Sequence, residues 1–366
     1  MSLLNPFERL SKRSLIPSTN FTPFVVSNGQ IVPTNFVDAS TALKNSDIFA
    51  VTNLISSDLA SATFKNCPFN ILNNPSELIN SFSFWQSAYL QLLLTGNTYL
   101  AIYKDNKGVP NRLEQIPTSQ VTVNLADDSS AIAYQINYQD DRDNVQLDAD
   151  EMIHIRLMPF GENGNQFIGR SPLESLPQMV AIQDQANKLS LSTLQNAINP
   201  STTITVPDAK LSKEAKDTIR DDFQALNTGA NFGKAIVLDQ SAKLATQTIN
   251  ADVAKFLSTT TFTQTQIAKA FGIPDSYLNG QGDQQSSLEQ ITTLYANSLN
   301  KYILPIQSEL QAKLFPTVQL DITQALDFDN SRYISMIESL ATSKALTAQQ
   351  AINALADRGL LDANKL

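Results

Sequence analysis

The sequence predicts an α+β fold for a chain of 366 residues. Short apolar runs separated by tight polar loops between residues 99 and 158 indicate antiparallel strands. Long stretches with helical periodicity come before and after this region. A chain of this length can form two or three domains with a large buried core.

Two helices are expected ahead of the strands. Residues 1–39 are rich in Pro, Ser and Asn, show no periodicity and predict an arm. The first helix spans about 46–62, and its apolar face carries Ile48, Val51, Ile55 and Leu59. The second spans about 75–94, with Asn74 as its N-cap and Pro75 in first position, and it ends at Gly96. Its apolar stripe is Leu78, Phe82, Trp85, Tyr89 and Leu92.

The strands follow one another with turn residues between them. Tyr99–Tyr103 precedes an Asn-Lys-Gly turn that ends at Gly108. The other expected strands are Val121–Val123, Ala131–Tyr138 and Met152–Met158. Such an order is typical of an antiparallel α+β domain rather than a nucleotide-binding parallel sheet.

The second half is mostly helical. A helix from Pro172 to Ile198, roughly 40 Å long, leads into a small module at 199–250. That module has an extended Ile204–Val206, a helix 212–226 and a strand 234–238. A helix 251–271 ends at Gly272, and the apolar-free segment 279–287 predicts a mobile loop. A long helix begins near Leu288 with a kink at Pro305, and two small helices follow, the second between Thr347 and Gly359.

Composition excludes several classes of protein. The net charge is −9 and only 17% of residues are charged, which argues against a simple basic nucleic-acid binder. Cys67 and His154 are the only residues of their kinds, so an intrachain disulfide or a structural zinc site is not expected. His154 lies in an apolar strand and is interpreted as a half-buried structural residue. We expect no cofactor, no metal and no membrane span.

Residues 164–171 differ by one residue from the phosphate loop G-x-x-x-x-G-K-[ST]. Asp239, which ends an apolar strand, could then hold magnesium. Arg170 replaces the lysine, however, and its planar guanidinium has a different reach. The alternative is a polar turn at Gly169 followed by Pro172 at a helix start. We favour this structural interpretation and predict no enzymatic activity.

The order of several segments is more specific than any one of them. These segments are 92–99, 153–156, 169–173, 271–280, 286–289 leading into Leu304 and Pro305, and the helix start at Leu346 and Thr347. Taken together, they make the chain resemble the portal (head-tail connector) proteins of tailed bacteriophages, of the short siphovirus type. The resemblance covers roughly residues 40–360.

This resemblance implies a function and a division into parts. It implies a ring, usually a dodecamer, at one capsid vertex of the virion, assembled in the host cytoplasm. Double-stranded DNA would pass through it during packaging and ejection. The implied partners are the terminase large subunit, the major capsid protein with its scaffold, and the head-tail adaptor. The implied parts are an arm 1–39, a wing 40–171 and 273–326, stem helices 172–198 and 251–272, a clip 199–250 and a crown 327–366.

Two sets of site residues follow. By family position, the loop 279–287 is the tunnel loop that faces DNA, formed by Asn279, Gly280, Gln281, Gly282, Asp283, Gln284, Gln285, Ser286 and Ser287. Leu191 and Leu194 share one face of the stem helix and are candidates for the subunit interface. Two other classes stay open: a nucleotide-dependent enzyme that uses residues 164–171, and a monomeric scaffold or adaptor protein.

Overall fold

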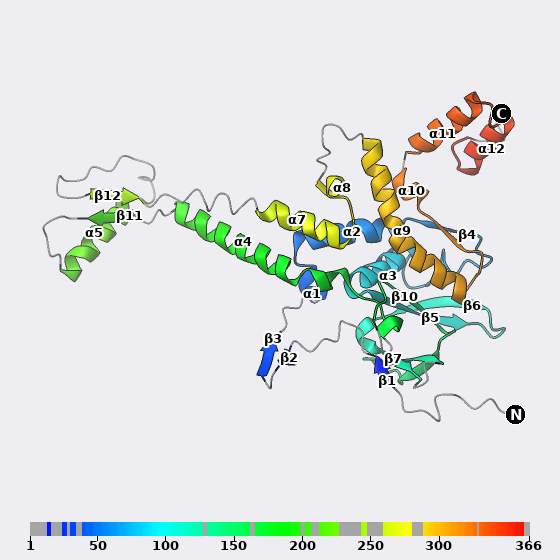
Figure 1. Cartoon of the computed structure of the whole chain (residues 1–366), viewed down its shortest axis with the longest axis horizontal. Helices are drawn as coiled ribbons and strands as arrows, with labels where there is room; N and C mark the ends of the chain where they lie inside the picture. The colour runs from blue at the N-terminus through cyan, green and yellow to red at the C-terminus, as the bar shows by residue number, and fades with distance from the viewer. Residues whose placement is uncertain are drawn as a thin grey trace. The chain divides into compact units, whose positions relative to one another are not determined.

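The computed structural model has the α+β architecture that the sequence predicts (Figure 1). It divides into two compact units: residues 1–180 with 263–366, and residues 181–262. The structure describes residues 13–15, 24–27, 30–33, 39–126, 130–161, 165–198, 202–205, 212–226, 243–246, 259–279, 288–327 and 329–361.

The first two long helices form much of the core of the larger unit. After the short α1 (Ala39–Ala42), helix α2 (Ser46–Ala60) begins at Asn45, whose side chain accepts hydrogen bonds from the N–H groups of Asp47 and Ile48. All four predicted apolar positions of α2 are buried, which confirms this helix. Helix α3 (Ser81–Thr95) ends at Gly96 in a left-handed conformation, as expected.

The predicted start of α3 is wrong. The helix begins six residues later than expected, and its N-cap is Asn80, which accepts a hydrogen bond from Ser83 N at 2.8 Å. The carbonyl of Pro75 instead accepts a hydrogen bond from Leu113 N (2.9 Å), so the preceding segment pairs with a strand. As a result Leu78, predicted to lie in the core, is 87% exposed, whereas Trp85, Tyr89 and Leu92 are buried.

Two antiparallel sheets pack on this helical layer and on each other. The three-stranded sheet has the order β10-β5-β6, formed by Met152–Arg156, Asn97–Lys104 and Pro110–Ile116. The four-stranded sheet has the order β1-β7-β8-β9, formed by Arg13–Leu15, Val121–Leu125, Ile132–Ile136 and Val145–Asp148. The predicted strands are confirmed, but β1, β6 and β9 were not predicted. The arm therefore contributes a strand to the sheet.

Strand β5 separates two hydrophobic clusters. Leu100 and Ile102 face the cluster formed with α2, α3 and the long helix α9 (Leu288–Lys313). Tyr99 and Ala101 face the cluster between the two sheets. A strand buried on both faces needs a nearly continuous apolar sequence. Strand β10 forms one edge of this sheet, and α9 covers it: Glu309 accepts hydrogen bonds from His154 N (3.2 Å) and Arg156 Nη2 (3.4 Å).

The predicted continuous helix 172–198 is in fact two pieces. A 3₁₀ turn (Pro172–Ser175) is capped by Ser171 and Glu174, and α4 (Pro177–Ile198) follows. Because Pro177 has no N–H and disfavours helical backbone at Leu176, the second piece starts afresh. Helix α4 has 22 residues and is about 33 Å long, shorter than expected.

In the smaller unit the structure describes two strands and a helix besides α4. Strands β11 (Thr202–Thr205) and β12 (Lys243–Thr246) pair with each other, and α5 (Lys213–Leu226) confirms the predicted helix. Strand β12 was not predicted. The predicted strand 234–238 and Asp239 lie outside the described residues.

The chain then returns to the larger unit. Helix α7 (Thr259–Ala270) precedes Gly272, which has a positive φ as expected, and α8 (Asp275–Asn279) precedes α9. Helix α9 is continuous on both sides of Pro305. Of the predicted loop 279–287, only Asn279 lies within the described residues, at the end of α8.

Three helices lie near the C-terminal end of the described chain: α10 (Thr323–Leu326), α11 (Ser331–Thr342) and α12 (Ala348–Asp357). The last two confirm the two predicted helices, whereas α10 was not predicted. Thr347 caps α12 in a capping box with Gln350, and Gly359 follows its end with a positive φ. The larger unit also contains two 3₁₀ turns, Thr118–Gln120 and Asn165–Phe167. Two antiparallel strand pairs belong to it as well: β4 (Thr63–Lys65) with β13 (Gln319–Asp321), and β2 (Phe24–Ser27) with β3 (Gln30–Pro33).

Candidate functional site

Three distant segments cross at Gly96, and this crossing contains the motif that resembles a phosphate loop. Leu157 N donates to the carbonyl of Gly96 (2.8 Å), and Arg170 N donates to the carbonyl of Leu157 (2.7 Å). The Asn97 side chain brackets Gly169: Oδ1 accepts from Gly169 N (2.7 Å) and Nδ2 donates to Gly169 O (3.0 Å). A Cβ on Gly96 would lie 2.3 Å from the backbone of Arg170. Glycine is therefore required for this approach.

The backbone N–H groups of residues 169–171, which would have to bind the phosphates of a nucleotide, are hydrogen-bonded within the chain. The N–H groups of Gly169, Arg170 and Ser171 donate to Asn97, Leu157 and Glu174. The guanidinium of Arg170 pairs with Glu174 at 3.0 Å. A phosphate loop instead directs its N–H groups at the anion. The neighbouring strands β5 and β10 are antiparallel, so the geometry favours the structural interpretation.

His154 is more deeply buried than predicted. It was expected to be half-buried, yet it is 0% exposed and lies between the two sheets. Because Asn97 Oδ1 is an acceptor, His154 Nε2 donates to it (3.0 Å), and Nδ1 accepts from the hydroxyl of Tyr134 (3.2 Å). Burial, with Arg156 and Lys313 nearby, lowers the pKa of His154 well below its ordinary value. The imidazole is thus a neutral structural group.

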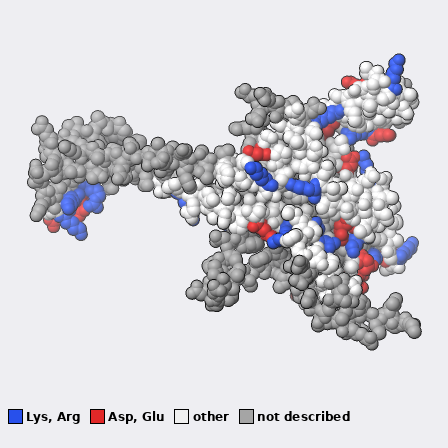
Figure 2. Space-filling view, viewed as in Figure 1, with Lys and Arg blue, Asp and Glu red and all other residues white. Residues whose placement is uncertain are grey.

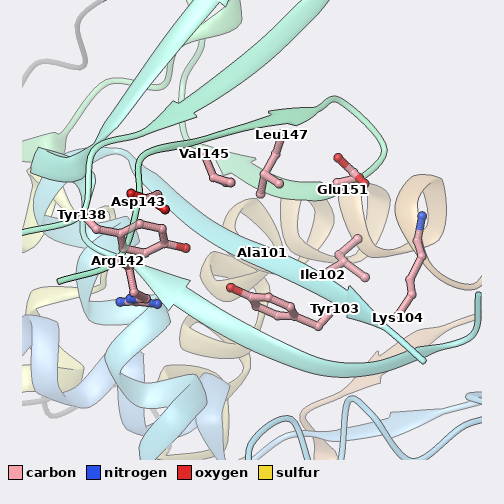
Figure 3. A pocket seen from close by; sticks show the side chains of 10 residues that line it. All are labelled: Ala101, Ile102, Tyr103, Lys104, Tyr138, Arg142, Asp143, Val145, Leu147 and Glu151. Atoms are coloured by element: carbon pink, nitrogen blue, oxygen red, sulfur yellow. The ribbon is translucent and has the colours of Figure 1, made fainter. Parts of the chain in front are cut away.

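A cleft of about 440 Å³ lies between strand β5 of the three-stranded sheet and strand β9 of the four-stranded sheet (Figure 3). Tyr103 and Tyr138 form its aromatic walls, and Val145 and Leu147 of β9 lie on the opposite side. The Arg142 guanidinium stacks on Tyr138, 3.7 Å from the ring centroid.

Arg142, at the rim of this cleft, is paired with carboxylates of the same chain. Arg142 Nη1 donates to Glu114 at 2.6 Å, and the Tyr103 hydroxyl donates to the same carboxylate at 2.7 Å. Burial opposes ionisation of Glu114, but these donors together lower its pKa. Asp143 and Glu151 lie at opposite ends of the cleft in Figure 3, so they do not form a carboxylate pair for acid–base chemistry. Half-buried tyrosines beside an exposed arginine, as found here, are typical of protein-contact surfaces.

The helices on either side of the predicted tunnel loop are tied together. The rings of Tyr277 and Tyr295 stack with centroids 3.9 Å apart at 9°, and the Tyr295 hydroxyl donates to Asp58 of α2. Burial raises the pKa of Asp58, and the bond from Tyr295 opposes that shift. Lys301 Nζ and the Tyr302 hydroxyl both donate to the carbonyl of Phe271, at 2.6 and 2.7 Å. Residues 275–279 are thus held against α9.

The predicted subunit-interface residues lie in α4. Leu191 is 58% exposed in the single chain. Leu194 lies in the same helix, but its side chain is outside the described residues, as are residues 280–287 of the predicted tunnel loop. The structure therefore does not test these site assignments. Within the described ranges, no group of three or more His, Cys, Asp or Glu could hold a metal ion, and no helix is long and apolar enough to cross a membrane.

The sequence analysis missed Asn97 and the Tyr277–Tyr295 pair. The Asn97 bracket joins residues 72 positions apart, and no local pattern reports such a contact. One local signal existed at Gly96-Asn97, where a helix-ending glycine is followed by a polar residue that opens an apolar strand.

Comparisons with known proteins agree with the architecture described above. The family model of the phage portal protein matches residues 46–365. An uncharacterized protein of Rickettsia bellii is 26% identical over 224 residues, which are 60% of this chain and 57% of that protein. The probable portal protein of Streptomyces phage phiC31 is 25% identical over 193 residues, 50% of this chain and 41% of that protein.

A solved structure gives the same fold. A chain from the neck of a native gene transfer agent particle, determined with C12 symmetry, has a TM-score of 0.64 at 20% identity. The match covers 88% of this chain and 92% of that chain.

The fold and the crossing at Gly96 thus define an α+β protein in which the N–H groups of residues 169–171 are hydrogen-bonded within the chain. The chain belongs to the phage portal protein family. It spans about half the length of the curated relatives that it matches.

Proposed function

We propose that the protein is a portal protein that forms a ring at one capsid vertex of a virion, through which double-stranded DNA is packaged and ejected. The family match over residues 46–365 carries this proposal. The likeness to a neck chain determined with C12 symmetry supports a ring homo-oligomer, and we propose a dodecamer. The proposed partners are the terminase large subunit, the major capsid protein with its scaffold, and the head-tail adaptor.

The proposed parts follow the sequence boundaries. Residues 40–171 and 273–326 form the wing, and 172–198 with 251–272 form the stem. Residues 199–250 form the clip, 327–366 the crown and 1–39 the arm. Helix α5 of the clip carries lysine, arginine, aspartate and glutamate together (Figure 2), as expected of a surface that docks protein partners.

Surface charge supports a channel that does not hold DNA. On the face of the described residues in Figure 2, basic and acidic side chains occur in small mixed groups. The chain has a net charge of −9. Each basic contact to phosphate adds salt-dependent affinity, so a surface without a basic stripe favours sliding.

The tunnel loop 279–287 is proposed to touch DNA sterically. It contains Asp283 and no Lys or Arg. Deletion of residues 282–285 should leave ring assembly intact and lower the rate of packaging or the length of the retained genome. Packaging by the shortened rings at the wild-type rate and to the wild-type length would remove the loop from this role.

We also propose that the chain itself has no nucleotide-dependent activity. The donor groups of residues 169–171 are already bonded within the chain, which supports this proposal. Calorimetry with ATP and Mg²⁺ should show no binding heat. A micromolar dissociation constant that Arg170→Ala abolishes would favour the nucleotide-dependent enzyme instead.

Electron micrographs and a measured mass of the purified protein test the ring directly. The micrographs should show closed rings with a central opening. The measured mass should be a fixed multiple of 40.1 kDa. A single-chain mass at all concentrations would favour the monomeric scaffold or adaptor.

A further inference from the structure

One face of α9 is exposed along the described part of this helix. Six of the exposed positions follow one another at alternating spacings of four and three residues: Gln290, Leu294, Asn297, Lys301, Leu304 and Ser308. Residues at such spacings share one face of a helix. We name these six residues the outer stripe of α9.

The charged residues of α9 that follow Glu289 are turned back into their own chain. Lys301 donates to the Phe271 carbonyl at 2.6 Å, and Gly272 leaves the space through which its amine passes. Glu309 is bonded to Arg156 and to His154 N. Lys313 Nζ donates to the Ala149 carbonyl. Burial lowers the pKa of Lys301 to about 8, in agreement with an amine withdrawn from water.

The stripe differs from the water-facing side of an ordinary helix. Such a side is usually charged, whereas this one carries Leu294 at 57% exposure and Leu304 at 60%. Pro305 has no N–H, so the Lys301 carbonyl receives no hydrogen bond from that position of the helix. Asparagine and serine side chains, an acceptor carbonyl and two exposed leucines are suited to packing against another protein surface.

We propose that the outer stripe of α9 packs against a neighbouring copy of the same chain. This inference rests on the proposed ring. In a cyclic ring each copy presents two different patches, so the stripe meets a different surface of its neighbour. Duplex DNA is a poorer occupant, because the single cation of the stripe is bonded to Phe271 and phosphate binding depends on basic contacts.

The size of the stripe agrees with one part of a larger interface. A helix of 26 residues is about 39 Å long and roughly 10 Å wide, so one face covers on the order of 400 Å². Stable interfaces bury about 800 Å² per partner. Other surfaces must therefore contribute, and Leu191 is the candidate that the sequence supplies.

Glutamate substitutions in the full-length chain test this interface. Leu294→Glu and Leu304→Glu should melt within a few degrees of the wild-type chain, because both side chains are exposed. Both variants should sediment as single chains or open oligomers under conditions in which the wild type forms rings. Leu78→Glu, at a position 87% exposed ahead of α3, is the matched control and should form rings. Intact rings for both α9 variants would overturn the proposal.

Thiol labelling gives a second readout that does not depend on a disruptive variant. In a Cys67→Ser chain, Leu304→Cys should react with a maleimide at least tenfold more slowly in rings than in single chains. Leu78→Cys should react at equal rates in both. Equal rates at residue 304 would overturn the stripe interface and leave the ring standing. Slowing only on addition of a DNA duplex would assign the stripe to the channel wall instead. A wild-type chain that never forms rings would remove both the ring and the stripe interface.

Discussion

Asn97 holds the backbone of Gly169 from both sides, with 2.7 Å from Gly169 N to Oδ1 and 3.0 Å from Nδ2 to Gly169 O. The two residues are 72 positions apart, and both are buried in the larger unit. The same Oδ1 accepts a hydrogen bond from His154 Nε2. One amide therefore joins the start of β5, strand β10 and the segment that leads into α4.

Replacement of Asn97 by alanine should strongly destabilise the larger unit. The change leaves the Gly169 N–H, the Gly169 carbonyl and His154 Nε2 without their partner in a buried place. Each unsatisfied buried group costs about 1–3 kcal/mol, so we expect a loss of roughly 3–5 kcal/mol in urea unfolding. The exposed Asn137 provides the control, since Asn137→Ala should change stability by less than about 0.5 kcal/mol. Equal effects of the two substitutions would contradict the role of the bracket.

Gly96 and Gly108 have nearly equal φ, so alanine substitutions at the two positions distinguish the cost of backbone strain from the cost of close packing. Gly96 has φ +76° and Gly108 has φ +78°, but only Gly96 is crowded by the backbone of Arg170. A Cβ on Gly108 would meet nothing within 4 Å. Gly108→Ala should cost about 1–2 kcal/mol from the left-handed conformation alone. Gly96→Ala should cost clearly more, with loss of soluble folded protein, because backbone atoms cannot move aside as a flexible side chain can.

Thermal melting of the two glycine variants measures this difference. A melting temperature for Gly96→Ala equal to that of Gly108→Ala would show that the crossing relaxes without cost.

The buried neutral His154 should make the protein less stable in mild acid. Its pKa in the folded chain lies below the unfolded value of about 6.5. Between these two values the unfolded chain binds more protons, so stability falls as pH falls below about 6.5. The slope from this residue is at most about 1.4 kcal/mol per pH unit. Above pH 6.5 this residue contributes no pH dependence.

Urea titrations at several pH values, with His154→Gln as the comparison, isolate this effect. The glutamine variant should be less stable overall but should show a shallower loss between pH 6.5 and 4.5. Burial would raise the pKa of Asp321, but hydrogen bonds from Lys65 and Thr323 lower it to about 2. Asp321 therefore loses its stabilising charge only in stronger acid. Parallel curves for the two chains would contradict a neutral buried imidazole.

Leu191 should be needed for assembly and not for folding. Its side chain is 58% exposed in the single chain, so Leu191→Asp should leave the circular dichroism spectrum and melting unchanged. If this position meets a neighbour, burial of the leucine contributes about 1.5–3 kcal/mol per interface. A buried aspartate would instead be unpaired. Sedimentation should then show single chains or open oligomers. Intact rings would place Leu191 outside the interface.

Local patterns in the sequence predicted many of the elements. Periodicity located α2, α5 and the strands β5, β7, β8 and β10, and Thr347 identified the start of α12. The pattern failed at α3, because Asn74-Pro75 and Asn80-Ser81 are both plausible helix starts. The pairing of Pro75 with Leu113 decides between them. The prediction of one continuous helix over residues 172–198 also failed, because Pro177 follows Pro172 closely and divides the helix.

The site was less predictable than the fold. The Gly169-Arg170-Ser171 motif was interpreted as structural, and its hydrogen bonds agree with that interpretation, but its partners Asn97 and Leu157 come from other parts of the chain. The edge strands β6 and β9 were missed because their sequences are mixed and polar, as exposed edges commonly are. The exposure of Leu294 and Leu304 depends on which face of α9 the core covers, and that information is tertiary.

The contact of Glu309 with the outer edge of β10 affects how copies of this chain can associate. An open strand edge allows chains to add to one another strand by strand, and such growth has no fixed end. A ring instead requires contacts that close after a set number of copies. Because a carboxylate of the same chain already occupies the His154 N–H, crowded copies are directed away from fibrous addition at this edge.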